Sequence, residues 1–237
     1  MIPKSINAST LILALIGVAT LSLVHLGCAA EKFETPAGDK VPLVLKLPNA
    51  AFKATPIDLP ANMKVEPISD KPRAEILVPK GCENLAAGIV PTCSDTNAGA
   101  AKLGKITDGK KDFYEESIVL LRRGVQHVQL GLKKPAEIHA IVIWHAHDTQ
   151  KVYRNVVVQV ADDAGFTQNV RTLYNNDTEN KAGQGAGTDR QYFESAEGRL
   201  IEAKGAKAQF VRMWSGGNTE SALNEYTEVE VWGKPVQ

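Results

Sequence analysis

The chain has 237 residues, and 43% of them are hydrophobic, which is typical of a globular protein. It carries 27 Lys and Arg and 27 Asp and Glu residues, so the formal net charge is zero. Because nucleic-acid-binding proteins usually carry a basic surplus, this balance argues against a nucleic-acid partner. The length allows one domain of about 150 residues together with additional segments.

Residues 1–30 have the pattern of a secretory signal peptide. Lys4 supplies a short basic region, and an apolar stretch follows over residues 11–26. This stretch is too short and wrongly flanked for a membrane-spanning helix. It ends in LGCAA, which favours Cys28 as the lipidated N-terminus of a bacterial lipoprotein, and cleavage after Ala30 is the alternative. We therefore expect a secreted chain in the periplasm or outer cell envelope, attached to a membrane only through an N-terminal lipid.

Residues 31–73 are predicted to form an extended, proline-rich linker. Prolines at this density leave no room for a helix, and they stand at Pro36, Pro42, Pro48, Pro56, Pro60, Pro67 and Pro72. Apolar residues such as Leu45 and Phe52 indicate that part of the linker docks on the domain that follows.

Two cysteines, Cys82 and Cys93, flank the short loop ENLAAGIVPT. In an oxidising compartment we expect them to form a disulfide that closes this loop. Two free thiols are the alternative. A metal pair is disfavoured, because no histidine and no second cysteine pair accompanies them.

The central part of the predicted domain, which spans residues 74–237, reads as three strands in a row. Their sequences are VQLGL, IHAIVIWHAH and NVVVQVAD, separated by turn chemistry at 133–135 and 147–150. The middle strand is apolar on both faces, with Ile141 and Ile143 on one and Val142 and Trp144 on the other. We therefore expect it to be covered on both sides.

Further short strands are predicted on either side of this centre. An Asp-Gly turn stands at 108–109, and a polar, glycine-rich loop at 175–189. The remaining strands are expected at 117–121, 191–194, 199–202, 209–215 and 227–232. Roughly eight or nine short strands with regular turn signals and no long helix predict an all-β fold, an antiparallel β-sandwich.

In order, these motifs resemble the discoidin, or coagulation-factor type C, family of galactose-binding-like domains. The matching pieces are 84–86, 106–109, 128–132, 138–144, 153–163, 210–213 and 228–233. The resemblance covers residues 74–235 and implies a jelly-roll sandwich that binds ligands on loops at one rim. In many members it also implies a structural calcium ion, and by position Asp108 and Glu228 match its carboxylate ligands. The chain departs from the family at 175–189 and in the WHAH sequence, where many members carry an Arg-bearing loop, so the resemblance does not identify the ligand.

Sugar binding requires an aromatic face and polar groups for the hydroxyls. Asn224 and Tyr226 are expected to be exposed, and Arg154 is placed to reach an acidic sugar or a carboxylate. A transition-metal site at His145, His147 and Asp148 is an alternative, although a packed histidine is the better interpretation. The candidate ligand-binding residues are Trp144, His145, His147, Tyr153, Arg154, Asn218, Asn224 and Tyr226, with Tyr192 and Trp214 as further aromatic candidates.

The sequence contains no GxSxG, HExxH or Walker motif and no GxGxxG after a strand. We therefore expect no enzyme but a secreted or envelope-anchored binding module for carbohydrate or another cell-surface polymer. The alternative is a structural or protein-interaction subunit of an envelope complex. A hydrolase accessory chain, or a weak enzyme that uses the histidine pair, is a third hypothesis.

Overall fold

The computed structural model describes residues 39–50, 59, 61, 63–69 and 71–236. The predicted signal peptide, with Cys28, lies outside the described residues. Within those residues, no helix combines the length and the apolar character that crossing a bilayer requires.

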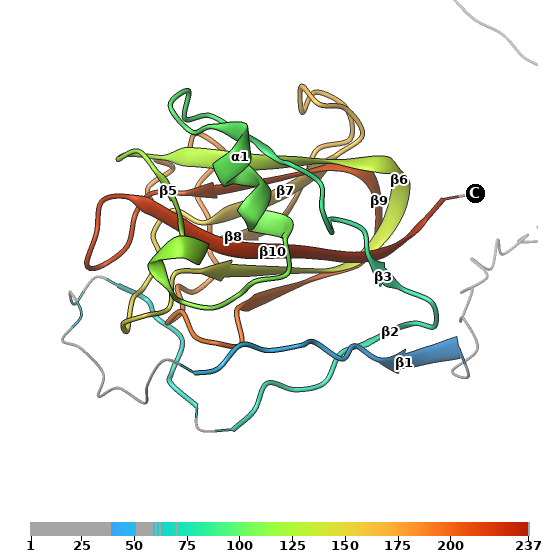
Figure 1. Ribbon diagram of the computed structural model, residues 1–237, viewed down its shortest axis with the longest axis horizontal. Helices are drawn as coiled ribbons and strands as arrows, with labels where there is room; N and C mark the ends of the chain where they lie inside the picture. The colour runs from blue at the N-terminus through green and yellow to red at the C-terminus, as the bar shows by residue number, and fades with distance from the viewer. Residues whose placement is uncertain (1–38, 51–58, 60, 62, 70, 237) are drawn as a thin grey trace, which may run out of the picture. The chain divides into compact units, whose positions relative to one another are not determined.

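The described chain is built mainly of antiparallel strands (Figure 1). A small sheet pairs β1 (Lys40–Pro42) with β2 (Leu77–Pro79). The short helices are α1 (Ala100–Leu103), η2 (Gly104–Thr107) and η3 (Glu115–Ser117). The main sheet contains β3 (Glu83–Asn84), β4 (Thr92–Cys93), β5 (Val119–Leu121), β6 (Gln126–His145), β7 (Val157–Ala161), β8 (Arg171–Asn175), β9 (Arg199–Ser215) and β10 (Asn224–Pro235).

The long strands β6 and β9 each run through both layers of a sandwich. In one layer, residues 136–145 of β6 pair with β10 and with the first half of β9. In the other, residues 126–131 of β6 pair with β4 and with the second half of β9, which continues to β7 and β8. The register of β6 against β9 shifts between Gly131 and Ala136. Both strands curve at the right-hand side of the sandwich in Figure 1. The structure therefore confirms the antiparallel β-sandwich.

The segment Lys133–Pro135 was expected to separate two strands, and this is wrong. The segment lies inside β6, at the bend between the layers. Turn-forming residues serve here to redirect one strand and not to end it, because a register irregularity bends a strand without interrupting its pairing.

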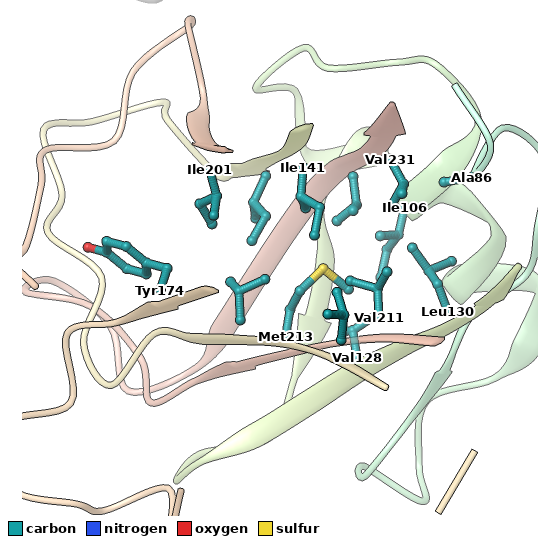
Figure 2. Packing of buried hydrophobic residues seen from close by; sticks show 14 of the residues in the cluster. Ala86, Ile106, Val128, Leu130, Ile141, Tyr174, Ile201, Val211, Met213 and Val231 are labelled. Atoms are coloured by element: carbon teal, nitrogen blue, oxygen red, sulfur yellow. The ribbon is translucent and has the colours of Figure 1, made fainter. Parts of the chain in front are cut away.

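The middle of β6 is covered on both faces, as its sequence predicts. Ile141 and Ile143 belong to the core between the layers, and Trp144 lies on the other face, where its Nε1 donates to the Ala196 carbonyl at 3.0 Å. Gly198 covers the indole, and a Cβ on it would stand 2.7 Å from Trp144, which requires glycine there. Across the core, Ile141, Ile201 and Val231 face Val128, Val211 and Met213 (Figure 2).

The described part of the linker lies against the sandwich. Residues Lys64 and Glu66 bond with Gln191 through their backbones: Gln191 N donates to Lys64 O at 3.0 Å, and Glu66 N donates to Gln191 O at 2.7 Å. The Glu66 carboxylate pairs with Arg199 at 2.8 Å. Arg73 donates to two carbonyls of the β8–β9 connection, each at 3.1 Å. These contacts agree with a linker that docks on the domain.

The predicted disulfide is not formed, and this prediction is corrected. Cys82 and Cys93 are both free and partly buried. Cys93 pairs with Val128 near the start of β6. Cys82 follows β2 and is next to Gly81, where a Cβ would stand 3.5 Å from the Lys234 side chain at the end of β10. Burial raises the pKa of both thiols, which lowers the thiolate fraction.

Candidate functional site

Most of the predicted ligand-binding side chains are in the interior, which corrects the expectation that they project from the rim. Asn224 and Tyr226 are fully buried because β10 begins at Asn224 and pairs at once with β5. Among the predicted set, Arg154 is exposed. The buried members are Trp144, His145, His147, Tyr153, Asn218, Asn224 and Tyr226; Tyr192 is also buried and Trp214 partly so.

The two histidines of the WHAH sequence have separate structural partners. His145 Nδ1 lies 3.0 Å from Glu194 Oε2, both side chains are fully buried, and the imidazole stacks on Tyr153 at 4.1 Å. His147 Nε2 lies 2.9 Å from the Lys111 carbonyl, and burial lowers the pKa of His147. Among the described residues no group of three or more His, Cys, Asp or Glu side chains is placed to hold a metal ion. Both histidines are therefore held by partners within the protein.

Glu225, which sequence reasoning did not select, organises several of the predicted residues. Its Oε2 accepts from Tyr153 Oη at 3.0 Å and from Asn218 Nδ2 at 3.3 Å. Lys151 Nζ donates to the same oxygen at 2.8 Å and to Asp148 at 2.7 Å. Burial alone would lower the pKa of Lys151, but these two carboxylates raise it. The network holds the β6–β7 and β9–β10 connections together beneath the rim.

The two candidate calcium ligands are close enough to influence one another. Glu228 is buried, its Oε2 accepts from Gly109 N at 3.1 Å, and its Oε1 has no hydrogen-bond partner. Burial raises the pKa of Glu228 to about 8, with the charges of Glu230 and Asp108 adding to the increase. Asp108 itself is exposed and accepts from Lys110 N at 2.9 Å.

This donor set fits calcium poorly. Calcium takes six to eight oxygen ligands, and of the two predicted carboxylates only Glu228 Oε1 is a buried oxygen without a partner. The buried ammonium of Lys111 already lowers the pKa of Glu228 from nearby and pairs with Glu230 at 2.6 Å. The ammonium group of Lys111 therefore supplies positive charge beside Glu228, which argues against the calcium ion expected at Asp108 and Glu228; calcium titration tests this directly.

A pocket of about 490 Å³ lies at the end of the sandwich where three connections meet. The β6–β7 connection contributes Arg154 and Asn155, and the linker contributes Met63 and Lys64. The β8–β9 connection supplies the rest of the wall, namely Asn176, Asp177, Thr178, Glu179, Lys181, Asp189 and Gln191. The structure therefore joins the predicted Arg154 to the polar loop 175–189.

Arg154 combines a fixed backbone with a free side chain. Its N–H donates to the Gly217 carbonyl at 2.9 Å, and its carbonyl accepts from Gly216 N at 2.8 Å. The side chain is exposed, and its guanidinium makes no hydrogen bond or ion pair with any residue that the structure describes. Five N–H donors are therefore available to a ligand from a defined position.

The loop 175–189 forms a wall of the pocket in which polar groups bond one another. Asp177 is buried, with Oδ1 accepting from Asn155 Nδ2 at 2.9 Å and Oδ2 from Ala182 N at 2.7 Å. Asn176 Oδ1 accepts from Val156 N at 2.7 Å, which ties the loop to the residue before β7. The oxygen-rich composition thus serves the loop's own fold.

The linker residues of the pocket, Met63 and Lys64, were missed by sequence reasoning. They lie in a segment whose proline content predicts only an extended chain, and no local pattern shows which residue of the sandwich it meets. Gln191 was assigned to a short strand; it forms a single parallel bridge with Val65. Met63 and Lys64 are distant from Gln191 in sequence, and the three residues come together only in the folded chain.

No protein-family model and no curated protein matches the sequence. Similar solved structures include chitosan-binding module 1 of a Paenibacillus sp. IK-5 chitosanase/glucanase, at 18% identity and a TM-score of 0.45, covering 64% of this chain and 99% of that one. The Clostridium perfringens module CpGH89CBM32-4, solved with GlcNAc-α-1,4-galactose, has 13% identity and a TM-score of 0.46, with coverages of 65% and 96%.

A family 89 glycoside hydrolase of Clostridium perfringens is similar at 15% identity and a TM-score of 0.45. The similarity covers 65% of this chain and only 15% of that enzyme's length. At these identities and TM-scores the likeness carries no argument about function, and the fold described above rests on the chain's own strand pairing.

Proposed function

We propose that the chain is a non-catalytic carbohydrate-binding module and that the pocket beside Arg154 is its binding site. The observation that carries this proposal is the free guanidinium on a fixed backbone at the wall of a polar pocket. The resemblance of residues 74–235 to the discoidin family supports it, because that resemblance implies ligand binding on loops at one rim.

The pocket has a suitable size and chemistry for a short stretch of a sugar chain. Its volume of about 490 Å³ lies within the range of roughly 300–1,000 Å³ that is usual for small-molecule sites. Planar amide groups from Asn155 and Gln191 and the hydroxyl of Thr178 line it. Groups of this kind donate to and accept from sugar hydroxyls. Neither His145 nor Glu194 lines the pocket, so neither has a role in the proposed binding.

We place this module in the cell envelope, on the strength of the signal pattern at residues 1–30. Lipidation at Cys28 would hold the chain on a membrane, and the linker would extend the binding domain away from the surface. Incorporation of labelled palmitate into the native chain but not into Cys28→Ser tests this location. Equal labelling of both chains, or of neither, contradicts it.

A second candidate function is docking of an envelope protein on the linker. Large apolar side chains are exposed on and beside the small β1–β2 sheet, and Val44 is the most exposed of them at 80%. Val41, Leu47 and Leu77 are exposed as well. Apolar groups gathered on a short sheet favour a protein partner. Co-purification of one envelope protein, lost in Val44→Asp, would support this function.

Affinity electrophoresis in gels that contain single polysaccharides tests the main proposal. We expect at least one polysaccharide to retard the chain, and Arg154→Ala to remove most of that retardation. Lys134→Ala is a matched control, because it also removes one exposed positive charge but lies at the bend of β6. If no polysaccharide in a broad panel retards the chain, carbohydrate binding is rejected.

A further inference from the structure

We propose that the pocket selects a carboxylate-bearing sugar chain, a polyuronate, and that the linker forms one wall of the site through Lys64. This inference rests on the proposed function and names the ligand class for the same pocket. It follows from three features of the lining: which charges are already paired, which side chains are missing, and how the linker is held.

The acidic groups of the pocket are already engaged, whereas two basic groups are free. Both oxygens of Asp177 accept hydrogen bonds from the loop and from Asn155. Asp189 accepts from the Asn175 N–H at 2.6 Å, and Glu179 pairs with Lys181 at 2.6 Å. The side chains of Arg154 and Lys64 are exposed and have no carboxylate partner among the described residues. An anionic group on a ligand can pair with these two free basic side chains.

Among the residues that the structure describes, those that line the pocket include no aromatic side chain. A neutral sugar usually gains much of its binding free energy by stacking a ring face on Trp, Tyr or Phe. The described lining offers no such stacking, so charge and hydrogen bonds must provide the affinity. An arginine fork matches the two oxygens of a carboxylate, which favours a uronate over a hydroxyl group.

The linker wall is held by an ion pair outside the pocket lining and by backbone hydrogen bonds to Gln191. Glu66 pairs with Arg199 at 2.8 Å, and the Arg199 guanidinium lies 4.8 Å from the ring centroids of both Tyr174 and Tyr192. Gln191 N also donates to the Lys64 carbonyl, and Glu66 N donates to the Gln191 carbonyl. Lys64 is therefore positioned by Glu66, two residues further along, which makes Glu66 a positioning residue that does not touch the ligand.

The test uses the chain without residues 1–30, the predicted signal peptide, in affinity electrophoresis with four polymers. Polygalacturonate carries the carboxylates, methyl-esterified polygalacturonate has the same sugar without the charge, galactan is neutral, and dextran sulfate carries another anion. We expect retardation by polygalacturonate, about tenfold weaker binding of the methyl ester, and weakening with added salt. Arg154→Ala should bind polygalacturonate about tenfold more weakly, Arg154→Lys should be intermediate, and Lys134→Ala should match the native chain.

The role of Glu66 is tested by a double-mutant cycle. Glu66→Gln should weaken polygalacturonate binding severalfold at a nearly unchanged thermal midpoint, and Glu66→Asp should restore part of it. In a Lys64→Met background, Glu66→Gln should cause no further loss, because Glu66 acts through Lys64. A full additional loss in that background overturns the role assigned to the linker.

The remaining outcomes separate this inference from the proposed function. If galactan and the methyl ester retard the chain as strongly as polygalacturonate, and Arg154→Ala weakens all three, the pocket binds sugar but the carboxylate selectivity is wrong. If dextran sulfate binds as strongly at equal charge, the carboxylate assignment is overturned in favour of a sulfate ester. If no polymer retards the chain, both the inference and the proposed function fail.

Discussion

The ammonium group of Lys111 lies 2.6 Å from Oε1 of Glu230, and both side chains are nearly buried. The same ammonium donates to the Lys46 carbonyl at 3.1 Å and stands 4.9 Å from the centroid of the Trp144 ring. Trp232 Nε1 donates to the other oxygen of Glu230 at 2.9 Å. A single buried cation thus connects the linker, β10 and the outer face of β6.

Lys111→Met is therefore expected to lower the free energy of unfolding by about 3–5 kcal/mol, because it leaves Glu230 buried without a counter-charge. Urea denaturation followed by tryptophan fluorescence measures this change. Lys110→Met is the matched control, since Lys110 is exposed and should change stability by less than about 0.5 kcal/mol. Equal effects of the two substitutions would show that the ion pair does not stabilise the fold.

Because Lys111 supplies positive charge beside Glu228, we expect the fold not to need calcium. The thermal midpoint should be the same in EDTA and in millimolar calcium chloride, and calorimetric titration should show no binding. A ligand that binds only the folded state raises the midpoint by mass action. A clear rise with calcium that Glu228→Gln abolishes would establish the ion at Asp108 and Glu228 after all.

The buried pair of His145 and Glu194 is expected to act in stability and not in binding. His145→Ala removes a fully buried ring and leaves Glu194 without its partner, so we expect a loss of about 3–5 kcal/mol. At a temperature where this variant is still folded, its affinity for polysaccharide should be unchanged. His139→Ala, which removes a partly exposed histidine from the same strand, should cost much less. Loss of binding by a folded His145→Ala protein would restore His145 to the site.

Acid should destabilise the fold partly through His127. Burial, together with the charge of Arg212, lowers the pKa of His127 to about 4, while the unfolded value is about 6.5. A lowered folded pKa means that stability is fully present above pH 6.5 and is lost as the pH falls toward 4. His127→Phe keeps an aromatic ring against Trp214, whose centroid lies 4.5 Å away, and removes the titration. Its thermal midpoint should fall less steeply between pH 6.5 and 4; parallel curves would contradict this.

Much of the fold was predictable because side-chain alternation depends on local sequence. The β-branched run from Ile138 to Trp144 predicts a strand that is buried on both faces, and the structure confirms it. The bend at Lys133–Pro135 was not predictable in the same way, because its residues favour a turn and a bend alike. Whether pairing continues through such a segment is decided by the neighbouring strand, β9, far along the chain.

The site was predictable only in part because burial is a property of the tertiary structure. Arg154 was selected for its chemistry, and it lines the pocket. Tyr226 and Asn224 were selected with the same reasoning, yet they begin a central strand and are buried. Glu225 and Lys64 carried no signal at all, since their roles depend on partners that are distant in sequence.

Hydrogen exchange measured with and without a polyuronate oligosaccharide tests the central claim most directly, since it locates the ligand on the folded chain. Binding at the pocket predicts slower exchange in residues 154–156, 176–182 and 63–66, and no change near the bend at 131–136. Protection confined to another surface, with these segments unaffected, would contradict the assignment of the pocket beside Arg154 as the carbohydrate site.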